Sequence, residues 1–522
     1  WRANLFGNSA KGSEYFLRHL LGAEDQVTSP EATPDKRPQS VVWRDQPGRG
    51  KLDLVTTLDF RMTGTALLSD IVLPAATWYE KADISTTDMH PFVHSFAAAV
   101  PPPWQARTDF QIFAQLADKV SELAAARLGV RTDVAPIPFI TDTPDEMANP
   151  HGLVRDWKTG QVEPIPGRTM PKIVVTQRDY SQIGQKYRTV GPLMTKLGAA
   201  TKGVTVNCDD PVAFLAERNG VAETGVGAGR PLIDTDVKLA DAILAFSGTT
   251  NGTQAQLGFE ALSQRTGRDL KHLYEENVGC RITYADTRVE PKPVFTSYEW
   301  SGSETGGRRY SAFTTNVEEL KPWHTVTGRQ QFYIDHDWMA ELGELLPVYR
   351  PPLHLLAHAP APASRAGGRQ AEVIVRYLTP HSKWSIHSQY QDNPFMLALS
   401  RGGPVIWLSV PDAEQAGIKD NDWIEAYNNH GVITARAIVS HRIPAGLVYM
   451  YHSKDRNVDV PKTESTGRRG GTHNAVTRLY MKPSHLLGGY GQLSYGFNYY
   501  GPTGNQRDEL TRIRRRSQEV EY

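Results

Sequence analysis

The chain has 522 residues, 39% of them hydrophobic, and its 57 basic side chains balance 57 acidic ones, so no bulk charge attracts it to nucleic acid or to an acidic membrane. Its two cysteines, Cys208 and Cys280, lie far apart, which excludes a disulfide framework and an all-cysteine metal or iron–sulfur site within the chain and favours a reducing, cytoplasmic compartment. No apolar run approaches about 20 residues, so the sequence predicts neither a membrane span nor a signal peptide, and its length predicts about two to four domains.

The chain begins at Trp1 rather than at a methionine, and we interpret it as a fragment or processed piece of a longer polypeptide. A helical pattern at Ser13–Leu21 is followed by a polar, proline-containing stretch. The β-branched content of Asp53–Leu58 predicts a buried strand, and Ser69–Pro74 predicts a second one after a helical turn that opens at Thr63. This order of strand, helix and strand predicts an α/β sheet.

Ligands of such sheets bind beyond the carboxyl ends of the strands, and we place Asp59 and Asp70 at such ends. A polar loop follows at residues 75–95, and helical periodicity predicts a helix at 109–128. Residues 129–230 are mixed and proline-rich. Further helical patterns cover 181–196, 210–218, 237–246 and 257–266, and a strand pattern covers Thr327–Tyr333.

Residues 351–370 are rich in proline, alanine and glycine, which is typical of a linker, and we place a domain boundary there. Short strand patterns with turn signals between them follow, which predicts a small all-β barrel over residues 371–522. The predicted strands are 372–378, 405–409, 423–428, 431–440 and 446–451.

The first strand of this barrel delivers a polar segment, Thr379–Tyr390, that contains His381, His387, Lys383 and several hydroxyls. Loops at the ends of strands present polar groups on a rigid scaffold, and His452 and His473 lie in similar loops after later strands. We therefore predict that the four histidines line one site.

The whole chain resembles the catalytic alpha subunits of membrane-bound respiratory nitrate reductases, in the dimethyl-sulfoxide-reductase superfamily of molybdopterin-dinucleotide enzymes. The order and spacing of many short motifs carry this resemblance. They include Trp43–Lys51, Leu58–Met62, Ser69–Pro74, Thr77–Lys81, Asp88–Phe92, Thr327–Tyr333, Thr379–His387, Asn421–Glu425, Gly470–Asn474 and Gly496–Gly501.

The resemblance implies a fold and a cofactor. Residues 1–350 are expected to form a Rossmann-like α/β region with helical insertions that binds one guanosine end of a molybdenum bis(molybdopterin guanine dinucleotide), and residues 371–522 a six-stranded double-psi barrel that closes over both pterins. The implied partners are an iron–sulfur beta subunit and a haem-containing membrane gamma subunit at the cytoplasmic face of the membrane. The molybdenum ligand and a 4Fe–4S cluster belong to an amino-terminal half that this chain lacks, so we expect the chain alone to be inactive.

We expect Asp59 to accept hydrogen bonds from guanine or ribose, with Asp70 and Asp88 as further candidates, and Arg61 to face a phosphate. From the residues alone, the alternative for Asp59 is a helix cap beside Thr63. The alternative for Arg61 is a surface ion pair of little energetic value.

The resemblance implies that His381, His387, His452 and His473 bind the pterins, where imidazoles tune the metal from outside its coordination shell. For any single histidine the alternatives are a surface or packing role, or a zinc site, which is disfavoured because no close pair shows ligand spacing. We expect Lys383, Ser388, Asn474 and Asn498 to contact the pterin or pyrophosphate. The arginine-rich tail, Arg512–Arg516, is expected to be a solvated charge run or a partner contact.

Two further functions remain open at this point. The first is a related molybdopterin oxidoreductase acting on selenate, chlorate or perchlorate. The second is a catalytically inactive, detached cofactor-binding module.

Overall fold

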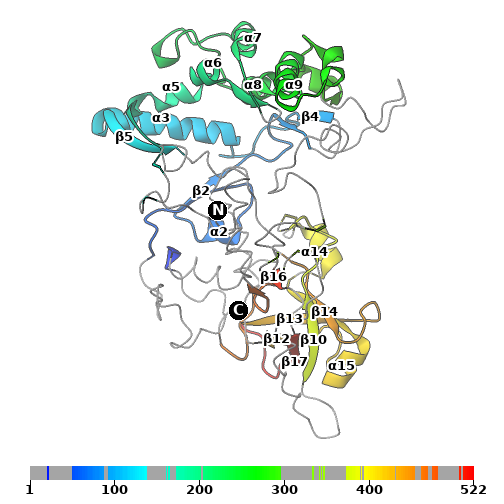
Figure 1. Cartoon of the computed structure of the whole chain (residues 1–522). Helices are drawn as coiled ribbons and strands as arrows, with labels where there is room; N and C mark the ends of the chain where they lie inside the picture. Colours follow the sequence, from blue (N-terminus) through cyan, green and yellow to red (C-terminus); the bar gives the residue numbers. More distant parts are fainter. Residues whose placement is uncertain are drawn as a thin grey trace.

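Figure 1 shows the computed structural model, with the helices of the middle of the chain at one end and a β-barrel at the other. The predicted linker at 351–370 lies outside the described residues, as do almost all of Ser13–Leu21 and Thr327–Tyr333. Apart from a few isolated positions, the structure describes residues 20–22, 50–87, 92–137, 172–201, 204–295, 372–387, 393–401, 403–428, 431–452, 460–467, 473–479, 505–506 and 510–522.

The first described unit is a strand–helix–strand motif. Strand β1 (Thr56–Asp59) and strand β2 (Ile71–Pro74) pair in parallel, and helix α2 (Gly64–Leu67) connects them. The Thr63 hydroxyl caps α2 by accepting a hydrogen bond from the Ala66 amide at 3.3 Å. The predicted α/β unit is therefore present, as a two-stranded sheet within the described residues.

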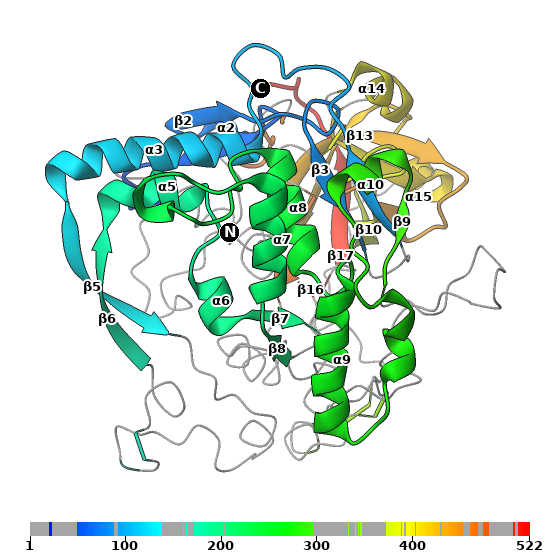
Figure 2. The ribbon, with the colours of Figure 1, turned by 90° about the horizontal axis from the view of Figure 1, so that it is seen from above.

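The middle of the chain forms a layer of helices (Figure 2). Its longest helix, α3 (Asp109–Arg127), begins with a capping box in which Thr108 and Gln111 satisfy each other's backbone amides. The other helices are α5 (Ile183–Tyr187), α6 (Leu193–Leu197), α7 (Asp209–Asn219), α8 (Asp236–Phe246), α9 (Gly252–Thr266) and α10 (Tyr284–Val289). Every helical pattern predicted here corresponds to one or more of these helices.

Short sheets accompany this layer. The hairpin of β5 (Val130–Ile137) and β6 (Lys172–Asp179) was not predicted, because a long segment separates its strands and no short turn signal joins them. The remaining strands are β3 (Asp83–Ser85), β4 (Phe92–Phe96), β7 (Ala199–Thr201), β8 (Val204–Val206) and β9 (Lys292–Pro293).

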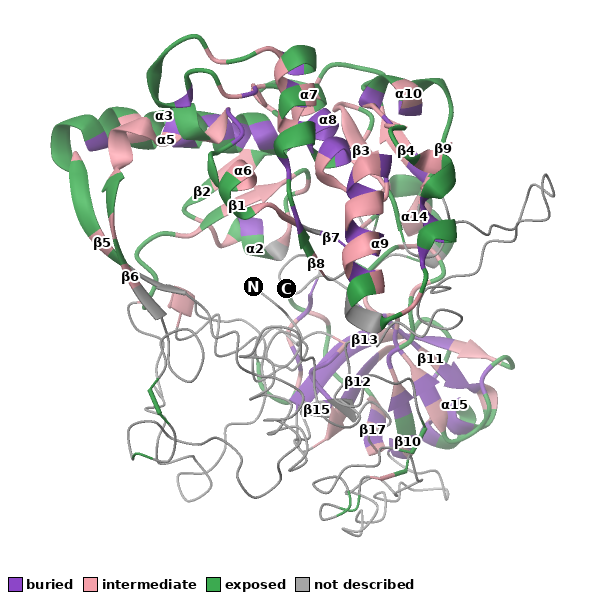
Figure 3. Cartoon of the chain, turned by 45° about the horizontal axis from the view of Figure 1, so that its top comes forward, coloured by how far each residue is buried: buried purple, intermediate pink, exposed green. Residues whose placement is uncertain are grey.

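The barrel closes in the order β10-β14-β11-β13-β12-β17. Two of its pairs, β10 with β14 and β11 with β13, run parallel, and the other four run antiparallel. Its core is a large cluster of buried hydrophobic side chains, seen as purple strands in Figure 3, and Leu68 of the first unit packs against that core. The strands are β10 (Glu372–Leu378), β11 (Val405–Ser409), β12 (Trp423–Asn428), β13 (Gly431–Ser440), β14 (Leu447–Tyr449) and β17 (Leu510–Arg515), with helices α14 (Pro394–Ser400) and α15 (Val410–Ala416) between them.

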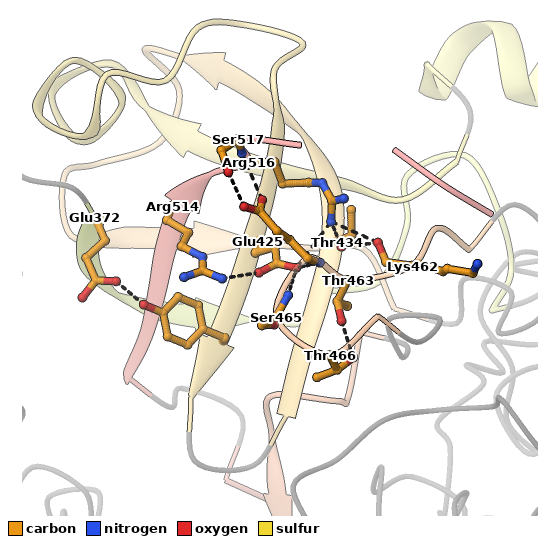
Figure 4. A network of polar contacts seen from close by, with 12 residues as sticks. Glu372, Glu425, Thr434, Lys462, Thr463, Ser465, Thr466, Arg514, Arg516 and Ser517 are labelled. Atoms are coloured by element: carbon orange, nitrogen blue, oxygen red, sulfur yellow. Dashed lines mark hydrogen bonds and ion pairs between the residues drawn. The ribbon is translucent and has the colours of Figure 1, made fainter. Parts of the chain in front are cut away.

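The arginine-rich tail forms the sixth strand of the barrel, so the expectation of a solvated charge run was wrong. Strand β17 pairs with both β10 and β12, and its Thr511 and Ile513 are fully buried in the barrel. The arginines alternate with these positions, and Arg514 reaches the fully buried Glu425 carboxylate at 2.8 Å (Figure 4). Alternate side chains of this strand therefore point into the barrel, although the segment is rich in arginine. No helix among the described residues is long and apolar enough to cross a membrane.

Candidate cofactor-binding site

The parallel pairing of β10 with β14 brings two distant histidines together. The register joins Arg376 to Leu447 and Leu378 to Tyr449, and the same offset carried beyond the strand ends aligns His381 with His452. A backbone hydrogen bond of 3.0 Å from the His452 amide to the Pro380 carbonyl continues this pairing. The two imidazole centroids are consequently 4.3 Å apart.

The other two predicted histidines join them. The His387 ring lies 5.1 Å from that of His381 and 4.9 Å from that of His452, and the His473 ring lies 5.9 Å from that of His452. We call these four residues the histidine cluster. The structure thus brings together the four imidazoles that the sequence placed in one site.

Hydrogen bonds in the cluster define which ring nitrogens carry protons. His452 Nδ1 lies 3.1 Å from the Pro380 carbonyl oxygen, which only accepts, so this nitrogen is a donor. In a neutral His452 the opposite nitrogen, Nε2, then accepts from His387 Nδ1 at 2.8 Å. The Pro380 carbonyl thereby fixes the tautomer of His452 and, through it, that of His387.

The loop that carries His387 adopts a conformation that most residues avoid. His387 has φ of 51° and Tyr390 has φ of 67°, both in the left-handed region. A tight turn holds this backbone, since the Gln389 amide donates to the Ile386 carbonyl at 2.8 Å and the Ser385 hydroxyl donates to the His387 carbonyl at 3.3 Å. Strained backbone of this kind is concentrated at binding and catalytic sites.

Tyr377 of β10 and Thr379, just beyond its end, support the cluster. Neither was predicted from the sequence as a site residue. The Tyr377 hydroxyl, at the centre of the barrel, donates to the His473 carbonyl at 3.0 Å, and burial raises the pKa of this tyrosine. The Thr379 hydroxyl is buried and has no hydrogen-bond partner among the described residues. A buried hydroxyl of this kind fits a polar ligand at the strand end. Their roles become visible only in the fold, which joins Tyr377 to the loop of His473 and buries the Thr379 hydroxyl.

Two other predicted residues border the cluster. Asn474 is buried directly after His473, and its side-chain oxygen accepts from the Thr477 hydroxyl at 3.3 Å. Lys383 is exposed, and its ammonium lies 4.8 Å from the centre of the Trp384 ring, a cation–π contact. Ser388 and Asn498 lie outside the described residues.

The predicted residues of the first unit lie at two different edges of its sheet. Asp59 ends β1 as expected, and its carboxylate accepts from the Arg61 amide at 3.0 Å. It does not cap α2, because Thr63 does. Asp70, in contrast, precedes β2 and accepts from the Val55 amide at 2.7 Å, so it lies at the amino end of the sheet. Its expected place at a carboxyl end was wrong, and its carboxylate anchors the start of β1. Asp88 lies outside the described residues.

Family models match three parts of the chain: Molybdopterin oxidoreductase at residues 34–119, Molydopterin dinucleotide binding domain at 375–490, and Nitrate reductase alpha chain, domain V, at 197–318. The second match contains the whole histidine cluster. The chain belongs to the molybdopterin oxidoreductase family. Within this family it is similar to nitrate reductase alpha chains, and it spans less than half of their length.

Curated relatives agree with this assignment. The chain is 57% identical over its full length to the nitrate reductase alpha subunit of Mycobacterium tuberculosis H37Rv and 46% identical over 99% of its length to the respiratory nitrate reductase 1 alpha chain of Escherichia coli K12. It is 28% identical over 97% of its length to the perchlorate reductase subunit alpha of Dechloromonas aromatica. The chain spans 42%, 41% and 38% of these relatives, respectively.

Proposed function

We propose that this chain binds and orients a molybdenum bis(molybdopterin guanine dinucleotide) as part of the catalytic subunit of a respiratory nitrate reductase, which reduces nitrate to nitrite with electrons from quinol. The observation that carries the proposal is the histidine cluster inside the matched dinucleotide-binding segment, in which three imidazoles follow the ends of two parallel strands and His473 joins them.

In this proposal the histidine cluster holds the pterin part of the cofactor. His387 and His452 form a chain with defined donors and acceptors, and Thr379 adds a buried hydroxyl. Together with Asn474, these groups fix the orientation of a ring system whose edge carries both donors and acceptors. When bound, the cofactor supplies the oxygen-atom and electron transfer.

The proposed nucleotide contacts lie in the first unit. Asp59 and Arg61 occupy the carboxyl end of β1, the edge at which ligands of open α/β sheets bind. We propose that they contact a guanosine and a phosphate, with Asp88 as a further candidate and Lys383, Ser388 and Asn498 as contacts from the barrel domain. The βαβ unit supports a Rossmann-like region, and the two parallel strand pairs of the barrel support its double-psi form.

The names of the relatives support partner subunits for this chain. An alpha chain is one subunit of an assembly, and we propose an iron–sulfur beta subunit and a haem-containing membrane gamma subunit as its companions. The assembly is proposed to hold this chain peripherally at the cytoplasmic face of the membrane. The molybdenum ligand and a 4Fe–4S cluster are assigned to the portion of the alpha chain that the 522 residues do not span.

The decisive experiment compares cofactor content in the complete alpha chain. His387→Ala removes an imidazole that contacts both His381 and His452, so we expect loss of molybdenum and guanine nucleotide or a shifted molybdenum potential. Metal analysis, nucleotide release and redox titration measure these effects. His441→Ala, an exposed histidine of the same barrel, is the control. Unchanged cofactor content and potential in His387→Ala would count against the assignment.

Sequence identity favours the main proposal over the perchlorate reductase alternative. The chain is 57% identical to a nitrate reductase alpha subunit and 28% identical to a perchlorate reductase subunit alpha. A turnover assay on the complete enzyme with nitrate, chlorate, perchlorate and selenate tests this choice, and we expect nitrate to have the highest kcat/KM. A detached, inactive binding module would instead bind the cofactor without turnover in any assembly.

A further inference from the structure

Three members of the histidine cluster also meet the requirements of a metal site. His381, His387 and His452 each present a ring nitrogen, and these nitrogens all lie within 4.8 Å of one another. We propose that they form a binding site for a divalent transition-metal ion, with Zn²⁺ as the probe, in chains that have not received their cofactor. Imidazole suits zinc, copper and nickel, and three histidines with one open position form a known zinc coordination set.

His452 is already oriented as a metal ligand. Metal-binding histidines commonly donate their second ring N–H to a carbonyl, which fixes the tautomer and directs the other nitrogen at the ion. His452 Nδ1 donates to the Pro380 carbonyl at 3.1 Å, and Nε2 points at His387. The same ring is buried, so its direction is set by packing as well as by the hydrogen bond.

The other two ligands can adjust around His452. Zinc–nitrogen bonds of about 2.0–2.1 Å in a tetrahedral site place the nitrogens roughly 3.3 Å apart. The His387–His452 contact of 2.8 Å must therefore open slightly, and the proton on His387 Nδ1 must move to Nε2 of the same ring or to solvent. Separations of up to 4.8 Å between the other ligand nitrogens must close. His381 and His387 are both exposed on the loop after β10, so their side chains can make these small shifts.

Tertiary structure, rather than local spacing, creates this site. His381 and His387 are six positions apart, and the third ligand comes from the end of β14, aligned by the parallel register. The argument from the sequence against zinc rested on the absence of a close pair of ligands, and it overlooked this pairing. The metal proposal does not depend on the pterin assignment, but if both hold, a bound ion and a pterin compete for the same imidazoles.

The test titrates Zn²⁺ into the chelator-treated 522-residue chain in competition with a chromogenic indicator. We expect a site of one ion per chain whose affinity falls at least about tenfold in His381→Gln and in His387→Gln, since the loss of a mere supporting partner already costs that much. His441→Gln, the exposed control, should bind as the unsubstituted chain does. Affinity that is equal in all three variants would overturn the proposal.

A second measurement needs no substitution. Bound Zn²⁺ should protect His381 and His387 from diethyl pyrocarbonate, as read by mass spectrometry, while the modification of His441 stays unchanged. Equal modification of all three with and without Zn²⁺ would also refute the site. Both measurements are made without cofactor, so their failure leaves the molybdopterin proposal standing, and loss of cofactor in His387→Ala leaves the metal site to be judged on its own.

Discussion

At the scale of single residues, a fully buried carboxylate connects the last strand of the barrel to its neighbours. Glu425 is fully buried and accepts from Arg514 at 2.8 Å, from Arg516 at 3.4 Å and from the Ser465 amide at 3.3 Å (Figure 4). Arg516 is itself almost completely buried. A buried charge is tolerated only when it is paired and hydrogen-bonded, and Glu425 provides that pairing for the last strand of the barrel.

We predict that Glu425→Gln lowers the free energy of unfolding by about 3–5 kcal/mol, because it leaves a buried guanidinium uncompensated. Denaturant unfolding measures the loss. The control is Glu521→Gln, whose exposed carboxylate lies 3.3 Å from Lys462 and should cost less than about 1 kcal/mol. Equal losses in the two variants would show that Arg516 finds another partner.

The tyrosines of the barrel predict a loss of stability at alkaline pH. Burial, and then the Glu372 carboxylate that its hydroxyl contacts, raise the pKa of Tyr427 to about 12. The folded state therefore holds this proton more tightly than the unfolded state, whose tyrosine pKa is about 10. Its contribution to stability is complete below about pH 10 and is lost as the pH rises towards 12.

Tyr427→Phe should therefore flatten the decline in unfolding free energy across this alkaline window. Chemical denaturation at a series of pH values provides the measurement, and Tyr79→Phe, at an exposed tyrosine, provides the control. An identical alkaline slope in the Tyr427→Phe variant and the unsubstituted chain would assign the decline to other groups.

At the scale of elements, the caps fix where helices begin and also join them. The Thr108 hydroxyl accepts from the Gln111 amide at 3.2 Å and donates to the Asp236 carboxylate at 3.0 Å, which links the starts of α3 and α8. Burial raises the pKa of Asp236, and the bond from Thr108 opposes that rise. One hydroxyl thus serves two helices.

We predict that Thr108→Ala destabilises the chain by about 1–2 kcal/mol, the upper part of the range for a lost helix cap, because the carboxylate of Asp236 also loses a donor. The free energy of unfolding from denaturant titration is the readout. Thr224→Ala serves as the comparison, since Thr224 precedes a short helix without capping it through its side chain. A Thr108 variant as stable as the Thr224 variant would contradict this account.

At the scale of the whole molecule, the chain spans 42% of the length of the nitrate reductase alpha subunit of Mycobacterium tuberculosis H37Rv. We predict that the isolated 522 residues do not sustain nitrate turnover, because we propose that the molybdenum ligand and the iron–sulfur cluster belong to residues outside this chain. A nitrite assay with a reduced dye tests this, with the complete three-subunit enzyme as the positive control. Steady turnover by the isolated chain would refute the proposal that catalysis needs residues outside this chain.

Much of this architecture follows from local pattern. Alternation and turn residues define β10, β11, β12 and β13 at the bounds that the structure shows, and helical periodicity with capping residues defines α3 and α8. These features are readable because each depends on residues within about one or two turns of itself. The charged β17 was misinterpreted, because a strand that alternates arginine with buried residues becomes recognisable only beside the carboxylates it meets.

The sequence by itself determined most of the helices, five of the six barrel strands, the resemblance to the family, and the grouping of the four histidines. Only the tertiary structure decided how they meet: the register of β10 with β14 aligns His381 with His452, and the Pro380 carbonyl sets the tautomer there. The tertiary structure also places Asp70 at the amino end of its sheet, opposite to the edge that was expected. The physical reason is that pairing between distant strands is fixed by the packing of the whole barrel, which no local pattern encodes.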